Sequence, residues 1–312
     1  MDIRVFSPVE LAYVLRALRN VALSDHHFSE GERALIEGIA RIHEVELALD
    51  TLEPIAFEEV ARVLVDPQRR KRAVQLAIVM SLVEGTPSRR AEQRVSDFAR
   101  ALGIEERGLS VLSEISHGHA LLARFDMLRR FSGFIRRAEG FPGFWKVAPT
   151  MLGIGGGDPE LAARYHALEG CAAGTLGRAV YDHFRANDFK FPGELGGMPL
   201  PFHDIGHVLA GYGTDPQSEI QQAAFQAGFA RRDGFTFLLF GIMQFHLGLK
   251  VTPVAEGHLG LFDVPRVMFA LGRGAACKVD FTQGYDLFAD QHRPLDEVRR
   301  HMGIPPLEHG SV

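Results

Sequence analysis

Apolar residues recur every three or four positions along most of the first 115 residues. This spacing places apolar side chains on one face of an α-helix, and six segments show it: 11–23, 30–45, 58–65, 69–84, 89–104 and 108–115. Brief stop signals separate the segments, among them Pro54, Asp66-Pro67 and Gly85-Thr86-Pro87-Ser88. Because no stretch alternates apolar and polar residues as a strand does, we predict a helical bundle with short turns.

The helical spacing breaks at residues 116–120, and a segment rich in arginine and aromatic residues follows. At roughly 100 to 200 residues per domain, a chain of 312 residues has room for two domains. We therefore predict an all-α protein with helical domains at 1–116 and 120–312. The most apolar stretch, residues 235–251, contains Gln244 and His246 and is too short to span a membrane, so we expect a buried helix, with a lipid-facing helix as the alternative.

The amino-acid composition indicates which kinds of partner the protein binds and which cellular compartment suits it. Lys and Arg total 34 and Asp and Glu total 39, which gives a net charge of −5 and no basic surplus to attract nucleic acid. Cys171 and Cys277 are too few for a disulfide scaffold and lack the CxxC spacing of a structural zinc site. These features favour a reducing cytoplasm and no nucleic-acid partner.

One short stretch carries metal-binding chemistry. His203 and His207 stand four residues apart after prolines that can open a helix, so both imidazoles project from one face. A reversal at Gly211-Tyr212-Gly213, followed by a capped second helix, would bring Glu219 back toward them. Two imidazoles with carboxylates suit Zn²⁺ first, with Fe²⁺, Mn²⁺ or Mg²⁺ as alternatives. Asp204 is a further metal ligand, a group that orients a histidine, or a base.

Aromatic and thioether side chains follow the candidate metal site. This surface suits a lipid-type ligand, and the candidate ligand-binding residues are Phe225, Phe229, Phe237, Phe240 and Met243. Core packing explains the same residues equally directly, because a Phe-rich helix in a domain of this size is commonly buried. Both interpretations remain open at the level of sequence.

The pattern His203-Asp204-x-x-His207, eleven residues and Glu219 resembles the metal motif of the coenzyme Q biosynthesis protein 4 family. The resemblance extends to Thr175-Leu176-Gly177-Arg178 and to residues 294–304, and covers roughly residues 120–308. It implies a helical fold in which His203, Asp204, His207 and Glu219 bind a divalent metal beside a cleft for a prenylated quinone precursor. It also implies oxidative decarboxylation of a polyprenyl-benzoate, assembly with other quinone-biosynthesis proteins, peripheral contact with the inner membrane, and a homo-oligomer.

The N-terminal segment resembles a different family. Residues 23–32 and 82–88 echo each other, each preceding a helix, and the acidic residue, turn and Ser-x-x-Glu pattern is similar to the tellurite-resistance TerB-like helical domain. That resemblance implies an acidic cation site formed by Asp25, Glu32, Glu84 and Glu92. The alternative is local: Ser29 and Glu32 have the spacing of a capping box, which fixes the start of a helix without any cation.

Two other classes compete with a quinone-pathway enzyme. An HD-type metal phosphohydrolase would use His203-Asp204 with an upstream histidine, His166 or His183, and a downstream aspartate such as Asp263. A non-enzymatic scaffold would use the metal only to hold a lipid head group while the N-terminal domain contacts membrane or partner proteins. Beyond the four candidate metal ligands the sequence indicates no general base and no site for an electron acceptor, so catalysis and scaffolding both remain open.

Overall fold

A computed structural model describes residues 1–25, 28–46, 48–49, 52–130, 132, 157–197, 201–251 and 255–307. The side chain of Asp25, expected to belong to an acidic cation site, lies outside the described part. Throughout the described residues the chain forms helices and two isolated β-bridges, and no strand. The all-α prediction is therefore confirmed.

The first half of the chain forms the predicted series of helices. They are α1 (Pro8–Ala22), η1 (Leu23–Asp25), α2 (Glu30–Ile42), α3 (Phe57–Val63), α4 (Pro67–Leu82), α5 (Arg89–Leu102) and α6 (Gly108–Ser116); residues 120–130 are also helical. Polar side chains fix the starts of most of them, because the first N–H groups of a helix need acceptors. Ser7 and Ser29 form capping boxes with Glu10 and Glu32.

The second half contains shorter helices. They are α8 (Pro159–Ala167), η3 (Leu168–Gly170), α9 (Leu176–Ala186), α10 (Pro201–Ala210), α11 (Pro216–Phe229), α12 (Phe235–Phe245), α13 (Val264–Ala276), α14 (Leu287–Asp290) and α15 (Leu295–His301). The apolar stretch from residue 235 ends its helix at Phe245, and ten of the residues of α12 are buried. Within the described part of the chain, no helix combines the length and hydropathy needed to cross a membrane.

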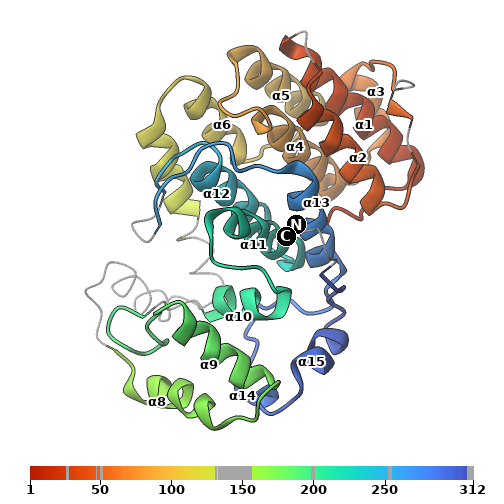
Figure 1. The fold of residues 1–312 in the computed structure, drawn as a ribbon. Helices are drawn as coiled ribbons and strands as arrows, with labels where there is room; N and C mark the ends of the chain where they lie inside the picture. The colour runs from red at the N-terminus through yellow and green to blue at the C-terminus, as the bar shows by residue number, and fades with distance from the viewer. Residues whose placement is uncertain are drawn as a thin grey trace.

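The central helices α11, α12 and α13 organise the molecule (Figure 1). α11 packs against both α12 and α13, while α13 contacts α2 and α12 contacts α4 of the N-terminal bundle. A second set of helices, α8, α9, α14 and α15, lies together below them, and we call this set the α9 group. α10 lies between the α9 group and the central helices and contacts both α9 and α11.

Glycines bring α11 and α13 into backbone contact. A Cβ atom on Gly228 would lie 2.5 Å from the carbonyl oxygen of Leu271, and one on Gly274 would lie 2.0 Å from the carbonyl oxygen of Phe225. Real side chains do not fit at such distances, so the close crossing of the two helices depends on glycine at both positions. This crossing fixes the position of α11, the helix that carries Glu219.

The buried core does not divide at residues 116–120. A continuous cluster of buried apolar side chains includes Ile39 and Ile78 of the N-terminal bundle together with Phe229, Phe235 and Met268 of the second half. Helical periodicity reveals that each helix has an apolar face, but not which faces meet. The division into two domains at this boundary stays a prediction.

Candidate metal centre

α10 and α11 form the helical hairpin that the sequence predicts. Gly211 ends α10 with a φ of 83°, a left-handed conformation that glycine adopts without strain. Asp215 caps α11 by accepting from the N–H groups of Gln217 and Ser218, and Pro216 occupies the first turn. The turn is short, so the first turn of α11 lies beside α10 and brings Glu219 to its histidines.

Three potential metal donors converge in this hairpin. Nε2 of His203 lies 3.2 Å from Nε2 of His207, and Glu219 places one carboxylate oxygen 3.5 Å from each ring nitrogen. Among the described residues, these three make up the group of metal-ligating side chains whose donor atoms all lie within 4.8 Å of one another. Donors bound at about 2.1 Å with near-tetrahedral angles are roughly 3.4 Å apart, so these spacings fit one divalent ion.

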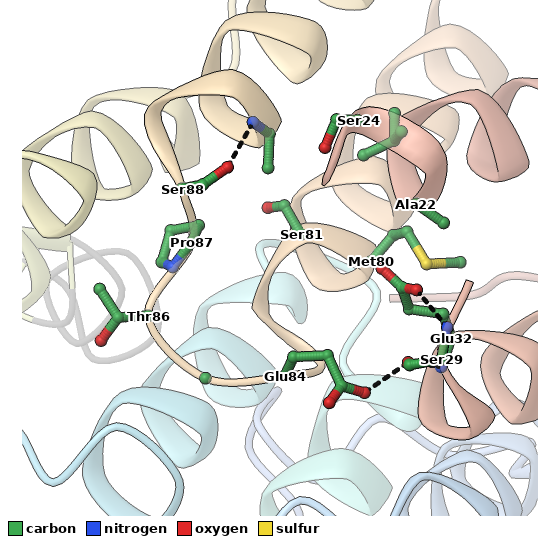
Figure 2. A pocket seen from close by; sticks show the side chains of 13 residues that line it. Ala22, Ser24, Ser29, Glu32, Met80, Ser81, Glu84, Thr86, Pro87 and Ser88 are labelled. Carbon is green, nitrogen blue, oxygen red and sulfur yellow. Dashed lines mark hydrogen bonds between the residues drawn. The ribbon is translucent and has the colours of Figure 1, made fainter. Parts of the chain in front are cut away.

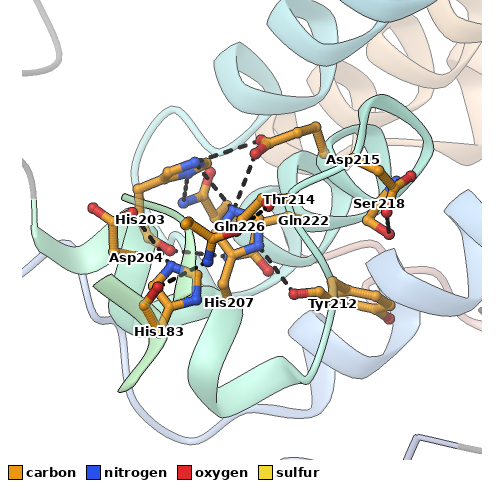
Figure 3. Close-up of polar contacts among 12 residues, drawn as sticks. His183, His203, Asp204, His207, Tyr212, Thr214, Asp215, Ser218, Gln222 and Gln226 are labelled. Carbon is orange, nitrogen blue, oxygen red and sulfur yellow. Dashed lines mark hydrogen bonds and ion pairs between the residues drawn. The ribbon is translucent and has the colours of Figure 1, made fainter. Parts of the chain in front are cut away.

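Neighbouring groups fix the orientation of both rings (Figure 3). Nδ1 of His207 lies 3.2 Å from the carbonyl oxygen of Tyr212, which can only accept, so Nδ1 carries the proton and Nε2 keeps its lone pair. The carboxamide of the buried Gln226 lies 2.9 Å from Nδ1 of His203 and directs the other ring nitrogen toward Glu219. A ring N–H that donates to a main-chain carbonyl, as that of His207 does, is characteristic of metal-binding histidines.

The pKa values of the two histidines are shifted in opposite directions. Burial disfavours a charge on His203, but the hydrogen bond and charge of Glu219 outweigh it and raise the pKa of His203 to about 9. Burial and the neighbouring charge of His203 lower the pKa of His207 to about 4. Burial raises the pKa of Glu219, yet the hydrogen bond and charge of His203 outweigh it and hold the pKa below its ordinary value. Without a metal ion, His203 is therefore protonated at neutral pH, whereas His207 is neutral and Glu219 is ionised.

Asp204 lies beside the three donors rather than among them. Its Oδ1 is 3.6 Å from Nε2 of His183 on α9, and its side chain is almost fully buried. The His183 ring stacks on the His207 ring, with centroids 5.6 Å apart (Figure 3). The role of Asp204 as a metal ligand stays a prediction.

The aromatic residues expected to bind a ligand are part of the packed interior. Phe225, Phe229, Phe237 and Met243 are buried, and Phe240 is half-buried. Phe225 contacts Phe229 at a centroid distance of 5.3 Å, as aromatic side chains in a core do. Phe237 contacts Phe202, the neighbour of His203, at 6.0 Å. Ligand contact by these residues stays a prediction. Phe240 is the half-buried residue of α12, and Phe237 lies one turn before it in the same helix.

The residues of the phosphohydrolase alternative are dispersed. His166 pairs with Glu194 on the surface, and Asp263 caps α13 by accepting from the N–H of Arg266. Neither belongs to the group of donors around Glu219. Of these three residues, His183 is the one that lies next to the His203-Asp204 pair. One of the additional residues that a phosphohydrolase would require is therefore near that pair.

Two of the N-terminal acidic residues, Glu32 and Glu84, line a small cavity between α1, α2, α4 and α5 (Figure 2). Ser29 accepts from the N–H of Glu32 and donates to a carboxylate oxygen of Glu84 at 2.5 Å. Glu32 in turn accepts from the N–H of Ser29, so the predicted capping box is confirmed. The cation interpretation of Glu32, Glu84 and Glu92 stays a prediction.

Two glutamines that contact His203, Gln222 and Gln226, were not predicted from the sequence. The sequence suggested a role for His183 only as part of the phosphohydrolase alternative. Gln222 and Gln226 stand four residues apart, on one face of α11, and both are buried. Buried carboxamides at that spacing signal polar partners on the facing helix. Gln222 donates to the carbonyl oxygen of His203, and Gln226 contacts its ring.

No protein-family model, curated protein or solved structure matches this chain. The interpretation of the site therefore depends on its own residues and geometry.

Proposed function

We propose that this chain binds one divalent metal ion, Zn²⁺ in the first place, through His203, His207 and Glu219. The observation that carries the proposal is the convergence of two Nε2 atoms and a carboxylate within 4.8 Å. The lone pair on Nε2 of His207 and the ionised state of Glu219 add to it, because a metal ion binds neutral imidazole and ionised carboxylate.

The donor set favours a site that also holds a second molecule. Structural zinc sites are usually closed by four protein ligands, whereas catalytic sites have three and leave a position for water or substrate. Two histidines and one glutamate are a donor set of the second kind. A bound ion would act there as a Lewis acid that polarises oxygen atoms of the ligand.

An oxygenated ring with an isoprenoid tail is the ligand that the surroundings favour. Phe202 adjoins His203 in α10 and is half-buried, and its ring meets Phe237 edge-on at 6.0 Å. A polar donor set beside aromatic surface suits a molecule with a polar head and an apolar tail. We therefore propose a role of the quinone-biosynthesis type, with a prenylated quinone precursor or another isoprenoid lipid as the ligand.

The proposal has a catalytic and a non-catalytic form. In the catalytic form the protein removes the ring carboxylate of a polyprenyl-benzoate oxidatively, with dioxygen or another electron acceptor as co-reactant. In the non-catalytic form it holds the lipid for other quinone-biosynthesis proteins at the inner membrane, as a homo-oligomer. Both forms require the metal site, so the metal is tested first.

The first experiment measures the metal content of purified protein by mass spectrometry. We expect about one ion per chain in the wild type and none in a His203→Ala/His207→Ala variant. The matched control, His166→Ala/His301→Ala, removes two exposed histidines outside the site and should retain the ion. Metal-free wild type, or unchanged metal content in the first variant, would refute the proposal.

The second experiment identifies the ligand and separates the two forms. Solvent extracts of the purified protein are examined for prenylated aromatic compounds, and metal-loaded protein is incubated in air with a carboxyl-labelled polyprenyl-hydroxybenzoate. Release of labelled carbon dioxide that disappears in the His203→Ala/His207→Ala variant supports catalysis. A copurifying prenylated ligand without release supports the scaffold.

A further inference from the structure

His183 is placed at the candidate metal centre without a hydrogen-bond partner for Nε2. This atom is shielded from solvent and makes no hydrogen bond to any described residue. Buried polar atoms are nearly always bonded, so such an atom calls for an explanation. Oδ1 of Asp204 lies 3.6 Å from this atom, beyond hydrogen-bond range but within reach of a small side-chain rotation.

The surroundings hold the His183 ring in this place. It stacks on His207, and Phe184 and Phe189 meet it edge-on at centroid distances of 5.8 and 5.9 Å. Asn187 donates to the carbonyl oxygen of His183 and accepts from Thr214 in the turn between α10 and α11. The end of α9 is thus tied to the same turn that positions Glu219, and Figure 3 shows His183 directed toward Asp204.

The balance of charge assigns Asp204 to the same site. Asp204 and Glu219 are largely buried carboxylates, with side chains 7% and 20% exposed. Imidazoles bind a metal ion in their neutral form, so His203 and His207 add no charge to the loaded site. One divalent cation then balances two carboxylates, whereas a second cation would leave an uncompensated charge of +2 in a buried site.

We propose that His183 is the positioning residue for Asp204, donating from Nε2 to Oδ1 and so directing Oδ2 toward the ion held by His203, His207 and Glu219. This inference rests on the proposed metal binding. It explains why the buried Nε2 atom of a half-buried histidine, which lacks a hydrogen bond, faces a buried carboxylate. Carboxylates that bind metal ions are commonly held by such a hydrogen bond from outside the donor set.

The test compares Co²⁺-loaded proteins, because the visible absorption of Co²⁺ responds to changes among its ligands. His183→Phe keeps an aromatic ring in the stack but cannot donate, and His183→Gln restores a donor at similar reach. We expect His183→Phe to weaken Co²⁺ and Zn²⁺ affinity by about 10- to 100-fold and to alter the absorption bands, and His183→Gln to restore both. His166→Phe, the same change at an exposed position, is the control.

A double-mutant cycle decides whether His183 acts through Asp204. In an Asp204→Ala background, or an Asp204→Asn background if that variant folds poorly, His183→Phe should cause little further loss of affinity. Equal losses in both backgrounds would overturn the inference. So would wild-type affinity and bands in His183→Phe, or two ions per wild-type chain of which His183→Phe removes one. Absence of metal binding in the wild type would instead refute the proposed function, and this inference with it.

Discussion

The proton on His203 competes with the metal ion, and this competition predicts a steep pH dependence of metal affinity. The pKa of His203 is raised to about 9, whereas those of His207 and Glu219 are lowered, so one group titrates between pH 7 and pH 9. Metal binding must displace that proton. With a pKa near 9 the apparent dissociation constant falls by about 50-fold from pH 7 to pH 9; with an ordinary histidine pKa it would change by only about 1.3-fold.

The assay is a competition titration against a chelator whose own protonation is known at each pH. Calorimetry in buffers of different ionisation enthalpy should also detect release of about one proton per ion bound at pH 7. An affinity that changes less than twofold across this range, with no proton release, would refute the reasoning. A His166→Asn variant should show the wild-type profile, because His166 lies on the surface away from the donors.

The stability of the metal-free protein should change in the opposite direction. The pKa of His203 is raised on folding from 6.5 to about 9, so its ion pair with Glu219 stabilises the fold fully below pH 6.5. That stabilisation is lost as the pH rises through about 9. Urea midpoints of metal-free protein should therefore fall between pH 6.5 and pH 9, and His203→Ala should flatten the decrease.

Two of the three further predictions concern the framework of the site, and the third concerns the start of α2. Gly206→Ala would place a Cβ 2.3 Å from Nε2 of Gln222, so it should lower the free energy of unfolding by about 1–3 kcal/mol and weaken metal binding. The control Gly170→Ala, with open space around the new Cβ, should leave metal binding unchanged. A urea midpoint of Gly206→Ala equal to that of the wild type would contradict this reasoning. Arg273→Leu should cost roughly 3 kcal/mol in urea unfolding, because the buried guanidinium donates to two main-chain carbonyls, and a loss below about 1 kcal/mol would argue against that role. Ser29→Ala should cost about 1 kcal/mol in thermal unfolding and leave the metal content unchanged; reduced metal content would favour the cation interpretation of its surroundings.

The helices and the hairpin of the site could be predicted because local rules determine them. Pro216 after the capping Asp215 starts α11, the glycine at 211 ends α10, and the four-residue spacing of His203 and His207 sets both rings on one face. Each of these signals acts over a few residues, so the sequence reveals them directly. The approach of Glu219 to the histidines follows from the short turn.

The surroundings of the hairpin could not be predicted in the same way. The contact between His183 and Asp204 depends on how α9 packs against α10, and the contact of Gln226 with His203 depends on the rotation of α11. Periodicity determines neither. The same limit applies to the aromatic residues: Phe229 fits both a lipid surface and a core from its sequence, and its full burial follows from the crossing of α11 with α13.

The donors of the proposed site come from two helices with different neighbours. His203 and His207 belong to α10, which contacts α9, whereas Glu219 belongs to α11, which is fixed by its close crossing with α13. An ion bound to all three would cross-link α10, which packs against α9, to the central helix α11. A second molecule could bind the protein more tightly when α10 and α11 are at one particular distance from each other. Such a molecule must change the affinity of the site for the ion, and the ion must change the affinity for that molecule by the same factor. Occupancy of the metal site would thus report on the spacing between two parts of the fold.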